Sequence, residues 1–295
     1  MSGTGRYAPS PSGDLHVGNL RTGLLAWMFA RSTGRSFRMR VEDLDRVRAG
    51  AEQRQLDDLA AVGLEWDPPL VRQSERGDAY TAALQALVDA GRTYECFCTR
   101  REIAEAASAP HGTPGLYPGT CRTLSTAERD ARRTERPAAI RLASEVVEAT
   151  VTDLLHGAYT GPVDDVVLMR NDGVVAYNLA VVVDDAAIGV DQVVRGDDLL
   201  SSAPRQAYLA TLLGIAPPTY AHVPLALNAD GQRLAKRDGA VTLADLAERG
   251  LAVDDVVAWI AESLGMTEAR TAGEMLERFD PAALPREPWV VVPPA

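Results

Sequence analysis

Lysine is almost absent from this chain of 295 residues. Lys236 is the one lysine among 30 basic residues, and the others are arginine. An ammonium is a compact charge on a flexible stem, whereas a guanidinium is a wider planar fork, so the two are not interchangeable. A lone lysine is therefore either a chance survivor on the surface or a group that contacts a moving phosphate. The segment around Lys236 is a candidate for phosphate chemistry.

Long apolar runs are also missing. No segment approaches the roughly 20 consecutive apolar residues of a membrane-spanning helix, and the first residues lack the apolar stretch of a signal peptide. These absences predict a cytoplasmic protein with no membrane partner. Cysteine is scarce, and three residues, an odd number, do not favour a disulfide framework in an intracellular chain. The three cysteines are therefore expected either to bind a metal or to lie buried in a core.

The rest of the composition is that of an ordinary globular protein. Hydrophobic residues make up 46% and charged residues 24%, and the length allows one large domain or two smaller ones. The net charge of -11 argues against indiscriminate binding to nucleic acid, although a local arginine-rich face can still exist on an acidic body.

Strand-like and helix-like segments alternate early in the chain and predict an α/β fold, a doubly wound parallel sheet. Strands are expected at 5–9, 36–42, 138–142 and 191–195, helices at 20–32, 50–62, 76–90, 199–213, 242–249 and 254–264, a hairpin at 166–177, and an irregular tail at 281–295. Cysteines, glycines and prolines interrupt the pattern after residue 93, which indicates an insertion. The predicted parts are 1–93, 94–190, 191–250 and 251–295.

The first chemical motif spans residues 6–19 and places His16, Gly18 and Asn19 at the start of the first helix. A helix N-terminus presents backbone N–H groups and a positive dipole end, which attract phosphate. Gly18 permits close approach, and His16 and Asn19 can donate hydrogen bonds. The bland alternative is a capped helix after a proline-rich turn.

This motif resembles the HIGH-type signature of the class I aminoacyl-tRNA synthetases, in the form found in the glutamyl branch. The segment from Arg233 to Arg237 resembles the KMSKS-type loop of the same class, with Lys236 at its second lysine. The resemblance implies that Lys236, His16 and Asn19 are catalytic. It also implies a Rossmann-type catalytic domain that binds ATP, with magnesium, through a set of residues at these two motifs. These are Pro9, Ser10, His16, Gly18, Asn19 and Lys236. Arg233, Ala235 and Asn19 depart from the family pattern.

A second set of residues matches the glutamate-binding positions of glutamyl-type synthetases. Two arginines can form forked, charge-assisted hydrogen bonds with the carboxylates of glutamate, a carboxylate can take the ammonium, and a tyrosine can add a hydrogen bond. The set is Arg6, Ala8, Ser10, Glu42, Tyr177 and Arg195. The alternative for the charged members is that they form surface ion pairs.

The cysteines form the third candidate site. Cys96 and Cys98 are separated by one residue and Cys121 follows later, so they offer three soft ligands, whereas structural zinc takes four. Tyr117 resembles the fourth ligand of a short glutamyl-synthetase relative, and His111 is its rival on ordinary zinc preference. The alternative is three buried free cysteines.

The resemblance narrows to the glutamyl-queuosine tRNA(Asp) synthetases, because only about 45 residues follow Leu251 and no anticodon-binding domain is expected there. It implies activation of L-glutamate by ATP and transfer to the queuosine base in the anticodon loop of tRNA(Asp). A monomer with one structural zinc ion is expected. Two alternatives stay open: a shortened synthetase that charges a tRNA 3′ end, and a silent paralogue that binds RNA or a partner protein.

Overall fold

A parallel sheet lies at the centre of the computed structural model, which describes residues 3–107, 116–234 and 241–294. Strands β1 (Thr4–Tyr7), β2 (Ser36–Val41) and β3 (Asp67–Arg72) pair in that order, all parallel. On the other side of β1, a parallel bridge from Thr4 to Val190 leads into β9 (Gln192–Gly196), which pairs with β10 (Thr219–Val223). The predicted α/β fold with a parallel sheet is confirmed.

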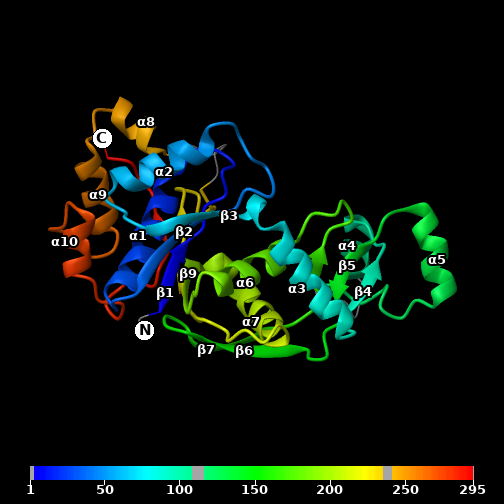
Figure 1. Cartoon of the computed structure of the whole chain (residues 1–295). Coiled ribbons are helices and arrows are strands. Elements are labelled where there is room, and N and C mark those ends of the chain that lie inside the picture. Colours follow the sequence, from blue (N-terminus) through cyan, green and yellow to red (C-terminus); the bar gives the residue numbers. More distant parts are fainter. Residues whose placement is uncertain (1–2, 108–115, 235–240, 295) are drawn as a thin grey trace.

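The long helix α1 (Val17–Arg31) supplies the main apolar core. Leu20, Leu24 and Met28 are fully buried, because helical spacing puts them on one face against the sheet. Helix α2 (Ala51–Ala61) precedes β3, and the 3-10 helix η1 (Gln73–Glu75) follows β3. At the same end of the molecule lie α8 (Leu243–Glu248), α9 (Val253–Glu262) and α10 (Ala272–Glu277) (Figure 1). The core of α1 continues into α9 and α10 through Val256, Ile260 and Met275.

A second core lies among α3 (Gly77–Asp89), α6 (Tyr177–Ala187) and α7 (Ala203–Leu212), the last preceded by the 3-10 helix η2 (Asp197–Ser202). Strands β6 (Glu148–Asp153) and β7 (Gly157–Pro162) extend the sheet beyond β10, in the order β7-β6-β10-β9. The pairing of β6 with β10 is parallel and is made at Tyr220 and Asp153.

The segment predicted as an insertion contains an antiparallel sheet of three strands and two helices. Strand β5 (Ala139–Leu142) lies between β4 (Thr93–Cys96) and β8 (Val167–Met169), and α4 (Arg100–Ala107) and α5 (Thr126–Glu135) follow β4 along the chain. Figure 1 shows α5 at the opposite end of the molecule from α8–α10. Ser125 and Glu128 cap the start of α5 reciprocally, so this short, exposed helix has a defined N-terminus.

Of two local predictions, the hairpin is confirmed in a shorter form and the irregular tail is partly wrong. The hairpin expected at 166–177 forms, but its second arm is short. Met169 bridges Val175 in antiparallel fashion, Arg170 N–H donates to Val174 O over 2.8 Å, and Ala176 N–H donates to Leu168 O over 2.9 Å, before Tyr177 begins α6. The tail is not wholly irregular, since β12 (Trp289–Val290) pairs in parallel with β11 (Ala226–Leu227). The indole of Trp289 packs edge-on against that of Trp259, with ring centroids 4.9 Å apart. The division of the chain after residues 93, 190 and 250 stays a prediction.

Within the described ranges, no helix is both long and apolar enough to cross a membrane.

Candidate active site and metal centre

His16 and Asn19 lock the start of α1 by capping each other. The backbone N–H of Asn19 donates to His16 Nδ1 over 3.3 Å, and the backbone N–H of His16 donates to Asn19 Oδ1 over 3.1 Å. Because Nδ1 accepts, a neutral imidazole carries its proton on Nε2. In Asn19 the side-chain oxygen accepts the capping hydrogen bond, so the side-chain amide nitrogen takes no part in the cap. The capped-helix interpretation and the phosphate interpretation are therefore compatible.

Most backbone donors at the start of α1 already have protein partners. Val17 N–H donates to Val241 O over 3.0 Å, and Leu20 N–H donates to His16 O over 3.2 Å. Gly18 is buried, and a Cβ added to it would lie 2.7 Å from the Cβ of Ala226. The structure thus gives Gly18 a packing requirement. The start of α1 therefore offers fewer unpartnered backbone N–H groups than the phosphate interpretation expects, and the side chains of His16 and Asn19 remain its candidate donors.

The KMSKS-like segment is anchored beside α1 at both of its ends. Leu234 and Val241 are buried in the same core as Leu20, and His16 forms an antiparallel bridge with Thr242. Arg233 pairs with Asp198 over 2.7 Å, a mostly exposed contact. Ala235 and Lys236 lie outside the described residues, so the catalytic role of Lys236 stays a prediction.

The glutamate-site candidates Arg6 and Glu42 meet through a buried arginine that the sequence analysis did not select. Arg40 has no exposed surface; its guanidinium pairs with the Asp185 carboxylate and lies 3.0 Å from Glu42. Asp185 also accepts from Arg6 Nε over 3.3 Å. Burial raises the pKa of the Asp185 carboxyl, but Arg40 and Arg6 reverse this effect and hold it below its ordinary value. The alternative of surface ion pairs is wrong for Arg6, which is 6% exposed, and the Glu42 side chain is only 15% exposed in its pair with Arg40.

Tyr177 and Glu42 line a cavity of about 600 Å³, together with Ser10. Tyr177 remains 42% exposed because it faces this open space. Burial of its surroundings raises its pKa, and Arg195, Glu42 and Arg6 all act on its hydroxyl through their charges. Arg6 donates to Val194 O over 3.2 Å, next to Arg195 in the chain. Arg6 therefore connects β9 to the cluster of Asp185, Arg40 and Glu42. A volume of this size suits a small-molecule site.

The cavity reaches from the glutamate-site candidates to the cysteines. Ser10 follows β1, and the backbone N–H of Glu42 donates to Pro9 O over 3.0 Å, which keeps this segment, with Ala8, beside the end of β2. Cys96 and Cys98 line the same cavity.

Arg195 is buried and lines a second, much smaller cavity of about 20 Å³, next to Val181 and Asp185. Its Nε–H donates to His222 Nε2 over 3.0 Å and its terminal nitrogens donate to Gln206 Oε1 (2.8 Å) and to a backbone oxygen of η2. Neither His222 nor Gln206 was selected from the sequence as a site residue, because isolated polar residues carry no periodic signal.

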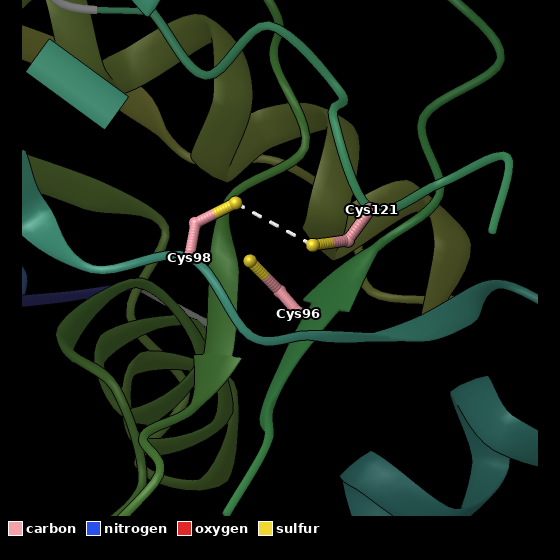
Figure 2. A group of neighbouring side chains, drawn as sticks. All are labelled: Cys96, Cys98 and Cys121. Atoms are coloured by element: carbon pink, nitrogen blue, oxygen red, sulfur yellow. Dashed lines mark hydrogen bonds between the residues drawn. The ribbon is translucent and has the colours of Figure 1, made fainter. Parts of the chain in front are cut away.

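The three cysteine sulfurs converge on one point (Figure 2). Cys96 and Cys98 come from the end of β4, and Cys121 comes from the segment before α5. Their sulfurs lie within 4.8 Å of one another, and those of Cys98 and Cys121 are 3.4 Å apart. The hydroxyl of Tyr117 lies 3.3 Å from the Cys96 sulfur and 3.5 Å from the Cys98 sulfur.

These separations fit a tetrahedral zinc site. Zn–S bonds of about 2.3 Å place two ligand sulfurs about 3.8 Å apart, so small shifts would let an ion enter. Three sulfurs and one oxygen supply four ligand atoms, and Cys96, Tyr117 and Cys121 are buried. Arg141 stacks on the Tyr117 ring at 3.6 Å and fixes its plane. His111, the rival ligand, lies outside the described residues.

Comparison with known proteins agrees with this geometry. Residues 4–280 match the family model "tRNA synthetases class I (E and Q), catalytic domain". A glutamate tRNA ligase from Elizabethkingia meningosepticum, solved in complex with its amino acid, superposes with a TM-score of 0.81 at 26% identity, over 97% of this chain and 66% of that one. A glutamate-tRNA synthetase from Elizabethkingia anophelis gives 0.84 at 25% identity, over 99% and 68%. Fold and site together define a ligase of the class I tRNA synthetases.

Two similar proteins belong to one family within this class. A glutamyl-Q tRNA(Asp) synthetase of Nocardia farcinica is 66% identical over 99% of this chain and 94% of that protein. A protein of the same name from Cutibacterium acnes is 54% identical over 92% and 79%. The chain belongs to the glutamyl-Q tRNA(Asp) synthetase family.

Proposed function

We propose that this ligase activates L-glutamate with ATP to glutamyl-adenylate and then transfers glutamate to the queuosine base in the anticodon loop of tRNA(Asp). The names of the relatives support the acceptor, and the family supports glutamate and ATP. The structural observation that carries the proposal is a connected group of charges beside a cavity of about 600 Å³. Glu42 and Tyr177 line this cavity, and Glu42 is linked through Arg40 and Asp185 to Arg6, which donates to Val194 O next to Arg195.

Each charged group of the bound glutamate faces a side chain of opposite charge. Arg6 and Arg195 donate forked hydrogen bonds to its two carboxylates, and Glu42 takes its ammonium. Tyr177 adds a hydrogen bond, and Ala8 and Ser10 complete the wall. Arg6 and Arg195 are both buried, so a bound carboxylate interacts with them through little water and the attraction is strong.

ATP lies against the start of α1 and the segment containing Lys236. Pro9, Ser10 and Gly18 shape the phosphate site, His16 and Asn19 donate from their side chains, and magnesium accompanies the nucleotide. A carboxylate oxygen of glutamate attacks the α-phosphorus, the bond to the bridging oxygen breaks, and pyrophosphate leaves with its electrons. Lys236 stabilises the negative charge that develops on the leaving group.

In the second step a hydroxyl of the queuosine cyclopentene ring attacks the acyl carbon of the adenylate. An ester forms, the acyl–phosphate bond breaks, and AMP leaves with the electron pair while the hydroxyl proton passes to solvent. The anhydride is already activated, so positioning of the two reactants supplies much of the acceleration.

The cysteine cluster is proposed to hold one structural zinc ion through Cys96, Cys98, Tyr117 and Cys121. The ion would tie the end of β4 to the segment before α5, and so fix the wall of the cavity that faces the glutamate site.

The test uses purified protein with ATP and labelled glutamate. The acceptors are queuosine-containing tRNA(Asp), queuosine-free tRNA(Asp) and tRNA(Glu), each with and without its 3′-terminal adenosine. Label on the queuosine-containing tRNA(Asp) in both forms is expected. Label on intact tRNA(Glu) that disappears with the terminal adenosine would instead identify a 3′-charging enzyme.

Pyrophosphate exchange without tRNA distinguishes an active ligase from the remaining alternative, a catalytically silent paralogue. Exchange that depends on glutamate and ATP is expected. A folded protein that shows no exchange would be a silent paralogue, and the proposal would fail at its first step.

A further inference from the structure

Three buried polar side chains form a row across neighbouring strands. Asp153 ends β6, His222 lies in β10, and Arg195 lies in β9 directly opposite His222 in the parallel register. His222 and Asp153 are 0% and 2% exposed, and Arg195 is 7% exposed. Buried titratable groups are costly unless they are paired, so the row needs a reason.

Continuous hydrogen bonds join the row. His222 Nδ1 lies 2.6 Å from Asp153 Oδ2, and Arg195 Nε lies 3.0 Å from His222 Nε2. Beyond Arg195, Gln206 accepts over 2.8 Å and donates in turn to Asn178 Oδ1 over 3.0 Å. The chain of contacts therefore runs from a buried carboxylate through an imidazole to a guanidinium.

The chemistry of these groups fixes the histidine tautomer. A guanidinium nitrogen can only donate, so His222 Nε2 must accept and its proton must be on Nδ1, where it is donated to Asp153. Asp153 also accepts from the backbone N–H groups of His222, Leu155 and His156, at 2.8–3.1 Å. These bonds keep the carboxylate in place and in its charged form, and the carboxylate in turn selects the tautomer that accepts from Arg195.

We propose that His222 is a positioning residue for Arg195, with Asp153 as the group that sets its tautomer. This inference rests on the proposed function, in which Arg195 binds a carboxylate of glutamate. Three of the five N–H groups of Arg195 donate within the protein, to His222, Gln206 and the backbone oxygen of Leu199, and the two others remain for a ligand. With its Nε–H fixed, the guanidinium presents those two in one orientation.

Surrounding contacts agree with an orienting role. The ring of Tyr220 lies 5.6 Å from that of His222, nearly parallel to it, and Arg195 lies over the Tyr220 ring at 5.5 Å. His156 Nε2 lies 3.1 Å from the backbone oxygen of His222. The imidazole is therefore packed on its face and hydrogen-bonded at both nitrogens, so it has one orientation in which to accept from Arg195.

A matched pair of variants tests the inference. In His222→Asn the amide reaches the position of Nδ1, so a bond to Asp153 is retained but Arg195 loses its acceptor. In His222→Gln the amide reaches the position of Nε2, so Arg195 keeps an acceptor. Both variants remove the ring and are polar, so the general disturbance is similar. The assay is glutamate-dependent pyrophosphate exchange, with separate KM values for glutamate and ATP.

The expected result is a rise of about tenfold in the glutamate KM of His222→Asn, equivalent to about 1.4 kcal/mol. The ATP KM should stay within about twofold, and His222→Gln should recover most of the glutamate affinity. Equal effects of the two variants, or an equal rise in both KM values, would overturn the inference. Absence of exchange in the wild-type protein would overturn the proposed function instead.

Nitrogen NMR of the wild-type protein gives a test that needs no variant. The inference requires the His222 proton on Nδ1 at neutral pH. A proton on Nε2, or on both nitrogens, would contradict it even if neither variant folds.

Discussion

Replacement of Arg40 by leucine should destabilise the protein strongly, because Arg40 is the fully buried cation among three carboxylates. It pairs with Asp185 and Glu42, and its Nε lies 3.9 Å from Asp184. Asp184 keeps other partners in Gln73, Tyr80 and Arg76. Asp185 retains only the longer bond to Arg6. The variant therefore leaves a buried carboxylate with too little positive charge.

Removal of one partner from a buried ion pair costs about 3 to 5 kcal/mol. An unfolding entropy of roughly 2.1 cal/mol/K per residue gives about 620 cal/mol/K for 295 residues. The melting temperature of Arg40→Leu should therefore fall by about 5 to 8 °C. Arg54→Ala is the matched control, because Arg54 pairs with Asp14 over 2.6 Å but both are about half exposed. Its effect should stay below about 2 °C.

The pH dependence gives a second check by differential scanning fluorimetry. In the wild type the Asp185 pKa lies below its ordinary value of about 3.9, so its stabilisation is complete above about pH 4 and is lost at lower pH. In Arg40→Leu, burial without Arg40 raises this pKa, so folding takes up a proton and acid favours the folded state. The gap between the two melting temperatures should narrow from about pH 8 to about pH 5. A shift of less than 2 °C, or a constant gap, would refute the reasoning.

Lys236→Ala should lower glutamate-dependent pyrophosphate exchange by about a hundredfold or more, and exchange at the wild-type rate would remove Lys236 from the mechanism. Wild-type protein should carry about one zinc equivalent by plasma mass spectrometry and Cys98→Ser should carry none, whereas a metal-free, folded and active wild type would contradict the zinc proposal. Gly18→Ala should cost about 1 to 3 kcal/mol, since its Cβ would lie 2.7 Å from the Cβ of Ala226. A Cβ on Gly77 meets nothing within 4 Å, so Gly77→Ala should not lower the melting temperature, and equal shifts for the two glycines would exclude the packing explanation.

The early strands and helices were predictable because their apolar residues recur with a clear period. Leu20, Leu24 and Met28 are one helical turn apart, and they are the residues that bury against the sheet. The β6–β7 hairpin was not predicted, since its outer face is exposed and Val151 is its main buried apolar residue. The hairpin expected at 166–177 forms, but its second arm is shorter than predicted, because turn residues specify a reversal of the chain but not the length of the strand that follows it.

In the candidate site, too, some residues could be predicted from the sequence and others could not. Cys96, Cys98, Tyr117 and Cys121 form close spacings in the sequence, and the structure brings them together. Asp185, His222 and Asp153 could not be selected in this way, because each contacts a residue that is far away in the sequence and on another helix or strand. Such tertiary contacts leave no signal in local spacing. The bond between His222 and Arg195 could not be predicted from the sequence for this reason.

The row from Asp153 to Arg195 also links glutamate binding to the correct pairing of strands β6 and β10. Strand β6 meets β10 at a single paired position, so few ladder bonds resist a shift of register. A shift of one residue moves a side chain to the opposite face of the sheet and would separate the carboxylate from the imidazole. Molecules with that error would keep most of their secondary structure yet bind glutamate poorly. Under the proposed function, glutamate affinity would therefore report on this strand pairing, and titration with glutamate would detect molecules misfolded in this sheet sooner than circular dichroism.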